Sequence, residues 1–231
     1  MGILVSEVVE KIEEDIVFGQ RHPRERLVED DLLVQFNAKK HVIREALTSL
    51  ERMGLVEKPK NKGAQVRDYT PEDVKQIFSV RKLLEAEAAR QIPLPADSIF
   101  LKSIKKVKSD HLKAVNRSDF RSAFRLNIEF YHILFGACGN SFLAEVIKDL
   151  KLKSLGIKFF SFANPELLKK SQKYHEIIIQ AIDQNDRNTL VEICSKLLEP
   201  CLEAYLAEHQ NFLARENETT FKGLEGLPVS S

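Results

Sequence analysis

The chain has 231 residues, of which 43% are hydrophobic and 30% charged, a balance typical of folded soluble proteins rather than disordered ones. This length is enough for two modest domains with separate cores. No apolar run approaches the roughly 18 residues that a membrane helix needs, and three cysteines without a CxxC pair favour a reduced, cytoplasmic protein.

The formal net charge of +1 indicates no particular partner, but the charges are unevenly placed. Residues 37–67 hold eight lysines and arginines against three glutamates, whereas residues 1–36 hold more acids than bases. A local excess of this kind is the electrostatic footprint that a polyanion such as nucleic acid uses.

Hydrophobic periodicity predicts three helices near the start of the chain. Valines and isoleucines at intervals of three and four residues predict a first helix over about 5–19, and a short helix is expected over 29–36. A third helix over 39–53 is predicted to end at Gly54, with the positive φ that glycine adopts readily. That third helix buries an apolar face: Val42, Ile43, Ala46, Leu47 and Leu50.

Two short strand patterns follow, "LVEKP" and "AQVRDY", on either side of the turn "KNKG". They predict a small β-hairpin. Helix, short helix, tight turn, helix and hairpin is the element order of a winged helix-turn-helix, whose second helix enters the major groove by its N-terminal residues. Residues 1–69 are therefore predicted to form a DNA-binding domain.

The third helix and the hairpin tip supply eight candidate DNA contacts: Lys39, Lys40, His41, Arg44, Thr48, Asn61, Lys62 and Gly63. Lys40, Arg44 and Thr48 share one helical face, opposite the buried residues. The helix dipole adds attraction for anions at this end, and the hairpin tip is placed to reach phosphates or the neighbouring minor groove. The alternative interpretation is a solvated basic face without a partner.

From residue 70 onward only helices are predicted. Thr70 is a helix N-cap and Pro71 suits the first helical position. Six helices are expected, over 71–91, 96–115, 119–137, 141–161, 165–183 and 187–213, the last bent at Pro200. The fold is therefore predicted to be mainly α, with an all-helical domain over 70–215 and a flexible tail over 216–231.

The stretch "LVEDDLLVQFNAKKHVIREALTSLERMGLVEKPKNKGAQV" resembles the DNA-binding domain of GntR-family transcription regulators, and the resemblance covers residues 5–68. It is carried by L-x-E-x-x-L, by V-I-R-E-A-L-x-x-L-x-x-x-G-L-V and by the glycine of the wing. It implies DNA contacts at Lys39, Lys40, His41, Arg44, Lys62 and Gly63. In this family a Ser or Thr followed by Arg usually opens the recognition helix, and two lysines stand there in this chain. Because lysine lacks the planar fork of arginine, the usual guanine contact need not be made.

The helices after residue 70 resemble the FCD effector domain of the FadR-like branch of that family, over about 71–210. The match is carried by "VRKLLEAEAAR", "FYHILFGACGNSFL", "YHEIIIQAIDQND" and the helix order. This resemblance implies a homodimer and a small-molecule effector such as a carboxylate. It also implies, in many members, a divalent metal held by one Asp and three His.

Four polar residues interrupt the apolar inward faces of three of these helices: Arg81, Asn127, Tyr131 and His175. A buried unpaired charge costs several kcal/mol, roughly, so Arg81 needs a partner. Glu85, one turn further on, is one candidate. The other is an anionic effector, for which Arg81 is the expected anchor because a guanidinium can grip a carboxylate with two parallel hydrogen bonds. A lone His or Tyr on such a face is more often a satisfied core residue, but four interruptions favour an effector pocket.

The metal-binding pattern that the resemblance implies is incomplete. The family's Asp and three His fall, in order, on Asn127, Tyr131, His175 and Leu197. Only His175 is a good ligand, where a stable site needs three or four, so no metal cofactor is expected. His132 is adjacent to one expected position but faces about 100° away on a helix. A rearranged site completed by His132, Glu129 or a bound metabolite is the alternative.

The sequence as a whole predicts a cytoplasmic, homodimeric transcription regulator, either repressor or activator, that binds double-stranded operator DNA. Its helical domain is predicted to bind a small, anionic effector and so to modulate operator binding. The alternative is a helical domain that only dimerises. An enzyme is not predicted, because no nucleophile or paired carboxylate accompanies His175 and Tyr131.

Overall fold

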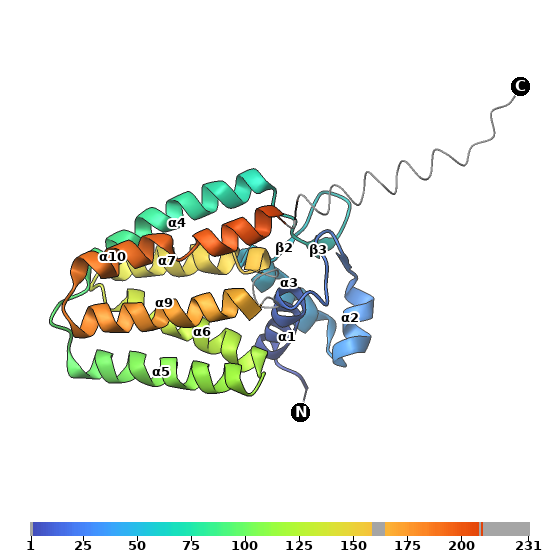
Figure 1. Cartoon of the computed structure of the whole chain (residues 1–231). Coiled ribbons are helices and arrows are strands. Elements are labelled where there is room, and N and C mark those ends of the chain that lie inside the picture. Colours follow the sequence, from blue (N-terminus) through green and yellow to red (C-terminus); the bar gives the residue numbers. More distant parts are fainter. Residues whose placement is uncertain (1, 159–164, 208, 210–231) are drawn as a thin grey trace, which may run out of the picture.

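The computed structural model describes residues 2–158, 165–207 and 209 (Figure 1). The N-terminal part, called the head here, contains α1 Val5–Val17, β1 Arg26–Leu27, α2 Glu29–Phe36, α3 Lys40–Arg52, β2 Val56–Glu57 and β3 Ala64–Val66. The helical domain contains α4 Pro71–Gln91, α5 Ser98–Asn116, α6 Phe120–Gly136, α7 Ser141–Lys153, the 3-10 turn η1 Gly156–Lys158, α9 Pro165–Asp183 and α10 Arg187–Lys196.

The head is a winged helix-turn-helix, which confirms the prediction. Asn37 makes the tight turn between α2 and α3 with a left-handed backbone (φ 46°), and Gly54 follows α3 with φ 76°. The wing contains a third strand, β1, that the sequence did not predict. The sheet order is β1-β3-β2, and both neighbouring pairs are antiparallel. A two-residue strand such as β1 is too short for a visible alternation of apolar and polar residues.

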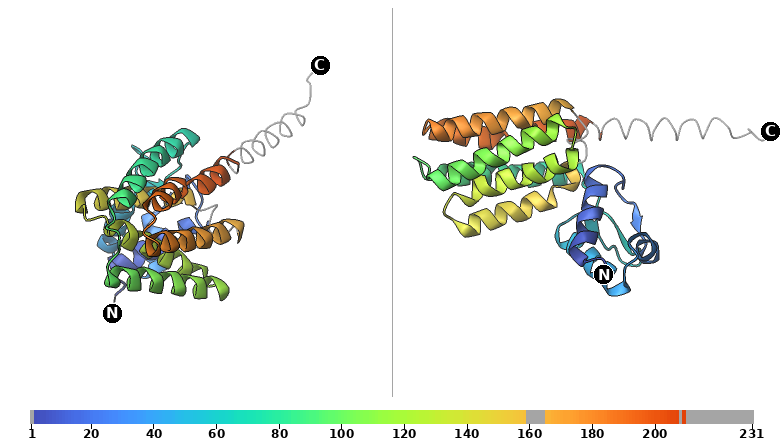
Figure 2. Two further views of the ribbon diagram at one scale, coloured as in Figure 1. Left: turned by 60° about the vertical axis from the view of Figure 1, so that its left-hand side comes forward. Right: turned by 90° about the horizontal axis from the view of Figure 1, so that it is seen from below.

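The helix α4 begins where the sequence predicts. The Thr70 hydroxyl accepts a hydrogen bond from the Asp73 amide at 3.1 Å, and the Asp73 carboxylate accepts one from the Thr70 amide at 3.0 Å. This reciprocal capping satisfies two backbone donors at the start of α4. The helices then form a bundle, in which α5 packs along α6 and α10 lies against α4 and α9 (Figure 2).

The helix predicted over 141–161 is too long, because α7 ends at Lys153. The Ser154 hydroxyl contacts the carbonyl oxygens of Leu150 at 2.9 Å and Lys151 at 3.0 Å, a back-bonding pattern that competes with continuation of the helix. Gly156 follows in a turn, where its Cα faces the Leu55 side chain of the head. The early end of α7 therefore lets the bundle approach the head.

The single bent helix predicted over 187–213 is also wrong. The helix α10 ends at Lys196, the chain turns over 197–198, and residues 199–207 are helical again. Pro200 lies in the first turn of this second segment, where its missing N–H is no loss, and the break therefore precedes it. The end of that predicted helix and the predicted tail over 216–231 lie outside the described residues.

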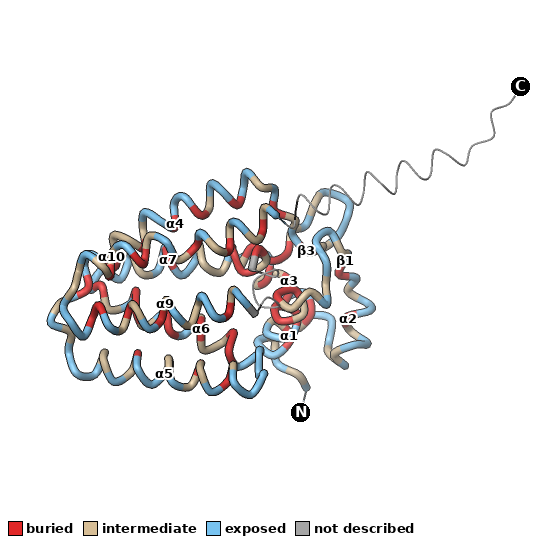
Figure 3. The backbone as a smooth tube through the Cα atoms, viewed as in Figure 1, coloured by how far each residue is buried: buried red, intermediate tan, exposed pale blue. Residues whose placement is uncertain are grey.

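Buried residues line the inward face of every long helix of the bundle (Figure 3). Phe130, Leu134, Ile178 and Leu190 are completely buried at its centre. The core of the head does not stop at the domain boundary, because Phe124 of α6 belongs to it. The two domains thus share part of one hydrophobic core.

Candidate DNA-binding surface and effector cavities

The start of α3 is exposed and open to an anion. Lys39 is the N-cap residue and makes no side-chain cap hydrogen bond, so the amides of Lys40 and His41 remain available to a ligand, whereas the Val42 amide donates to the Lys39 carbonyl at 3.0 Å. Lys40, His41 and Arg44 are exposed along the first turns. The apolar face beneath them, which includes Ile43, is buried, as the periodicity predicts.

Two of the predicted DNA contacts are engaged by neighbours within the head. Arg44 forms an ion pair with Glu29 of α2 at 2.9 Å, and Lys58 of the wing lies 3.3 Å from the Thr48 hydroxyl. Lys58 also pairs with Glu51 at 2.8 Å. Exposed pairs of this kind contribute only about 0–1 kcal/mol, so DNA phosphates can replace them.

The wing tip lies beside the recognition helix. Asn61 and Gly63 adopt left-handed backbones, with φ of 66° and 75°, and turn Lys62 outward. A cleft of about 320 Å³ is lined by Arg44 of α3, by Lys62 and Gly63 of the wing and by Arg26 of β1. The structure therefore brings the predicted helix and wing contacts together and adds Arg26, which the sequence missed because β1 carries no strand signal.

Arg81 of α4 is held by its own helix. Its guanidinium donates to one Glu85 oxygen from Nε at 2.9 Å and from Nη2 at 2.6 Å, and Nη1 lies 2.7 Å from the Ser154 hydroxyl. The two charged side chains are 1% and 0% exposed. Glu85 is thus the partner that Arg81 needs, which is the first of the two possibilities open from the sequence. Within the described chain, the second carboxylate oxygen of Glu85 has no hydrogen-bond partner.

A first cavity, called the polar cavity here, lies beside this pair and has a volume of about 80 Å³. Arg81, Glu85, Asn127, Tyr131, Lys151, Ser171 and Tyr174 are among its lining residues. The Ser171 hydroxyl donates to the Asn127 side-chain oxygen at 3.1 Å. The sequence missed Lys151, because the apolar pattern of α7 does not show that this lysine turns inward.

A second cavity, called the apolar cavity here, lies between α6 and α7 and has a volume of about 190 Å³. Its wall is mainly aliphatic and aromatic: Ile128, Phe135, Ala144, Ile147, Leu152 and Leu155. Asn127, Tyr131 and Lys151 line both cavities. The Lys151 ammonium lies 4.1 Å from the centre of the Tyr131 ring.

His175 is fully buried and lines neither of these two cavities. Its ring stacks on Phe130 at 3.8 Å and meets the edges of Tyr131 at 5.4 Å and of His111 at 4.9 Å. Burial lowers the pKa of His111 to about 4 and the pKa of His175 well below its usual range. Both rings are therefore neutral at pH 7. His111 was not singled out from the sequence, although it continues the buried face of α5.

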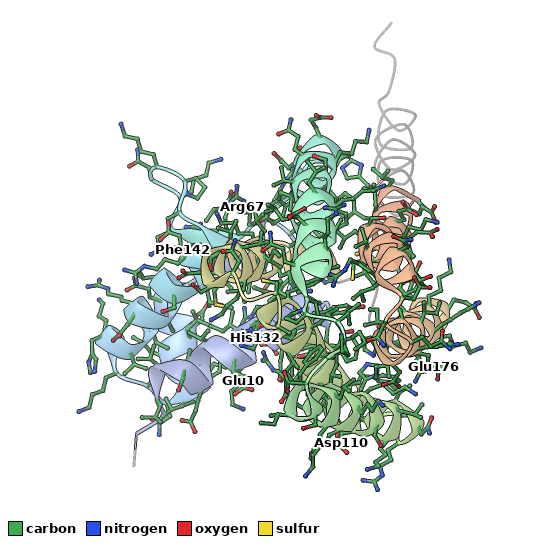
Figure 4. The ribbon with its side chains drawn as sticks, turned by 90° about the vertical axis from the view of Figure 1, so that its left-hand side faces the viewer. Glu10, Arg67, Asp110, His132, Phe142 and Glu176 are labelled. Atoms are coloured by element: carbon green, nitrogen blue, oxygen red, sulfur yellow. The ribbon has the colours of Figure 1, made fainter. Side chains whose placement is uncertain are left out.

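A charged contact between α1 and α6 joins the head and the bundle. Figure 4 labels one of its residues, Glu10 of α1. Arg125 of α6 reaches Glu13 at 2.7 Å, Glu14 at 3.3 Å and Glu10 at 3.4 Å, and Arg121 reaches Glu14 at 2.9 Å. We call these five residues the head–bundle contact. Burial raises the pKa of Glu13, whereas the hydrogen bond from Arg125 lowers it, and the net shift is upward.

Comparison with known families assigns both domains. The FCD domain family matches residues 76–200, which is more than half of the chain, and the family of bacterial regulatory proteins named gntR matches residues 4–66. This chain belongs to the GntR family. The presence of the FCD domain fits the FadR-like branch, as the resemblance in the sequence indicates.

Individual relatives agree with this assignment. YdhC of Bacillus subtilis strain 168, an uncharacterized HTH-type transcriptional regulator, is 29% identical over 57% of this chain and 59% of YdhC. This match therefore spans about three fifths of that relative. RspR of Escherichia coli strain K12, an HTH-type transcriptional repressor, is 22% identical over 82% of this chain and 83% of RspR.

Solved structures share the fold. E. coli McbR/YncC superimposes with a TM-score of 0.74 at 16% identity, covering 90% of this chain and 100% of that one. A GntR-type regulator from Rhodococcus sp. RHA1 has a TM-score of 0.71 at 16% identity, covering 88% and 97%. GntR-family proteins are transcription regulators that bind operator DNA, not enzymes. In the part of the chain that the structure describes, no helix is long and apolar enough to span a membrane.

The FCD domain of this GntR-family chain does not offer the metal ligands that the resemblance implies. The Asn127 oxygen already accepts a hydrogen bond from Ser171, and Leu197 has no donor atom in its side chain. Burial raises the pKa of the Tyr131 phenol well above its usual range, so the phenol stays protonated. Among the described residues, no three His, Cys, Asp or Glu side chains gather as metal ligands do.

Proposed function

We propose that this regulator senses a small anionic metabolite in its helical domain and that the bound metabolite changes its affinity for operator DNA. The observation that carries the proposal is the position of α6. This helix lines both cavities through Asn127 and Tyr131, and it contacts the head through Phe124 and Arg125. A ligand that shifts α6 therefore acts on the head, which is the coupling between two sites that sensing requires.

The head supplies the DNA contacts in this proposal. We assign them to Lys39, Lys40, His41, Arg44, Thr48, Asn61, Lys62 and Gly63, with Arg26 and Lys58 added from the structure. The free amides at the start of α3 and the cations around the cleft support this assignment. RspR is a repressor, and we infer repression as the mode of regulation in this chain as well.

We infer that the protein works as a homodimer joined through α4 and α7. These two helices pack side by side and expose four large apolar side chains, namely Val80, Leu83, Phe142 and Val146. Phe142 is 80% exposed and Leu83 is 71% exposed. Large apolar side chains exposed on two adjacent helices are typical of a surface that another protein covers.

We also propose that the domain works without a divalent metal, because three of the four family positions lack a suitable ligand. Elemental analysis of protein purified without an affinity tag tests this. About one zinc, nickel or manganese per chain, lost in a His175→Ala variant, would overturn the proposal. The three cysteines are buried and form no disulfide with one another, which favours a cytoplasmic location where thiols stay reduced.

A thermal-shift screen with small carboxylates tests sensing, followed by gel-shift titration of operator DNA with each compound that raises the melting temperature. We expect at least one compound to raise the melting temperature and to change operator affinity. A helical domain that only dimerises predicts no compound that does both, and this result would reject the sensing function.

A further inference from the structure

Lys151 is a cation at the junction of the two cavities. Arg81 also lines the polar cavity, but its guanidinium is held by Glu85 and Ser154. Lys148 and Lys170 line one cavity each and are exposed, whereas Lys151 is half-buried and lines both. Its ammonium lies over the Tyr131 ring, 4.1 Å from the ring centre, in a cation–π contact.

The two cavities differ in chemistry on either side of Lys151. On the α4 side the wall carries the Arg81–Glu85 pair, with a Glu85 oxygen that has no partner in the described chain. On the α7 side apolar side chains, among them Ile147 and Leu155, form the wall. A molecule that occupies both must carry polar groups at one end and an apolar body at the other.

We propose that the effector is an amphipathic monocarboxylate, whose carboxylate binds the Lys151 ammonium and whose apolar body fills the apolar cavity between α6 and α7. This inference rests on the proposed sensing function. The Asn127 amide and the protonated Tyr131 hydroxyl stand at the same junction and are donors for the carboxylate oxygens. The free Glu85 oxygen then accepts from a hydroxyl or amine next to the carboxylate.

The same geometry disfavours other classes of metabolite. A dicarboxylate or tricarboxylate that reached into the apolar cavity would place a second charge beside Phe135, Ile147 and Leu155, whose side chains cannot pair with it. Beyond Lys151, the polar partners in that lining are Asn127, Tyr131 and the exposed His132 and Lys148. A hydrophobic alcohol fills that cavity but offers Lys151 no negative charge. The expected effector therefore carries one negative charge and an apolar chain.

Calorimetric titration of the full-length protein with acetate, butyrate, hexanoate and hexan-1-ol tests the inference. Each added methylene should tighten binding about fourfold until the apolar cavity is filled. Hexan-1-ol should bind at least about tenfold more weakly than hexanoate, because it lacks the charge-assisted hydrogen bond. Equal affinity for acetate and hexanoate would overturn the proposal.

Three variants locate the site. Lys151→Met should weaken hexanoate binding about tenfold or more, whereas Lys151→Arg should retain it. Lys153→Met removes an exposed lysine of the same helix that lines neither of the two cavities, and it is the matched control, with affinity unchanged. Wild-type affinity in Lys151→Met would contradict the assignment. If Lys151→Met does not fold, Ala144→Phe decides, since filling the apolar cavity should abolish the dependence on chain length.

The outcomes separate this inference from the sensing function. A compound that changes operator affinity but binds Lys151→Met as tightly as the wild type rejects the Lys151 site and leaves sensing in place. In the opposite outcome, hexanoate binding depends on chain length and on Lys151 as expected, but operator affinity does not change. This result supports the Lys151 site and rejects the sensing function.

Discussion

Lys40 and Arg44 are the single residues on which DNA recognition should depend most. We expect Lys40→Ala with Arg44→Ala to weaken operator binding by about 1–3 kcal/mol for each base-directed hydrogen bond that the change removes. A gel-shift titration with the cognate operator measures the change. The control removes two exposed cations of the bundle, Lys102 and Arg117, and should leave affinity unchanged. Wild-type affinity in the first variant would rule out the assigned recognition helix.

His111 and His175 make the stability of the bundle dependent on pH. Burial lowers the pKa of His111 from 6.5 to about 4, and burial followed by the charge of His111 lowers that of His175. Below pH 6.5 the unfolded chain therefore binds more protons than the folded chain, so the free energy of unfolding falls on acidification towards pH 4. The slope should reach about 1.4 kcal/mol per pH unit for each histidine.

Urea denaturation at neutral and mildly acid pH measures this slope. Replacing His111 by Gln should make the slope shallower, because one buried titrating group is lost. Replacing the exposed His132 by Gln should leave it as it is. An unchanged slope in His111→Gln would show that this histidine does not carry the pH dependence.

At the same scale, the sequence predicted some site residues and missed others. The sequence left the partner of Arg81 open, and Arg81 was predicted to anchor an anionic effector. In the structure Glu85 holds it, because residues four apart meet on a helix and a buried charge needs a partner. Lys151 was missed because one lysine near the C-terminal end of a helix is ordinarily a solvated residue. His175 was predicted to line the pocket, but in the structure it lies behind Tyr131. Helical periodicity shows that a side chain faces inward, but it does not show how far that side chain lies from the cavity wall.

At the scale of elements, helices with clear ends were predicted within a residue or two. The helix α3 has its glycine after the last turn, and α4 has its Thr70 cap. The end of α7 depends on the Ser154 hydroxyl, and β1 depends on pairing with β3. Neither contact leaves a periodic signal in the local sequence, so both elements were predicted wrongly or not at all.

The head–bundle contact is the element-scale feature that should transmit the effector signal. Arg125→Met removes one ion-pair partner from each of Glu10, Glu13 and Glu14 on α1. We expect this variant to bind hexanoate like the wild type, while its operator affinity no longer responds to the ligand. Arg117→Met, which changes an exposed arginine at the end of α5, is the control.

Calorimetry and gel-shift titration of the same Arg125→Met preparation give the two affinities. Hydrogen exchange in α1 should become faster in this variant, because the head loses a partly buried ionic contact with the bundle. A full response of operator affinity to the ligand would show that the signal passes through another route.

At the scale of the whole molecule, the exposed apolar face of α4 and α7 should decide the oligomeric state. Leu83→Asp with Phe142→Asp places charges on both helices of that face, and we expect a monomer by light scattering at micromolar concentration. Ile99→Asp changes a side chain of α5 that is 78% exposed and should remain dimeric.

The affinity for an operator with two half-sites depends on dimerisation. A dimer places two heads on half-sites about one DNA turn, ~34 Å, apart, or closer if the heads sit obliquely, and the contacts of both heads then add. A monomer holds one head on one half-site. The Leu83→Asp, Phe142→Asp variant should therefore bind DNA with a single half-site as tightly as the wild type does. It should lose the wild-type preference for an operator with two half-sites. The wing and α3 are untouched by these changes, so any loss comes from assembly rather than from the DNA-binding surface. A variant that stays dimeric would place the dimer interface on another face of the bundle.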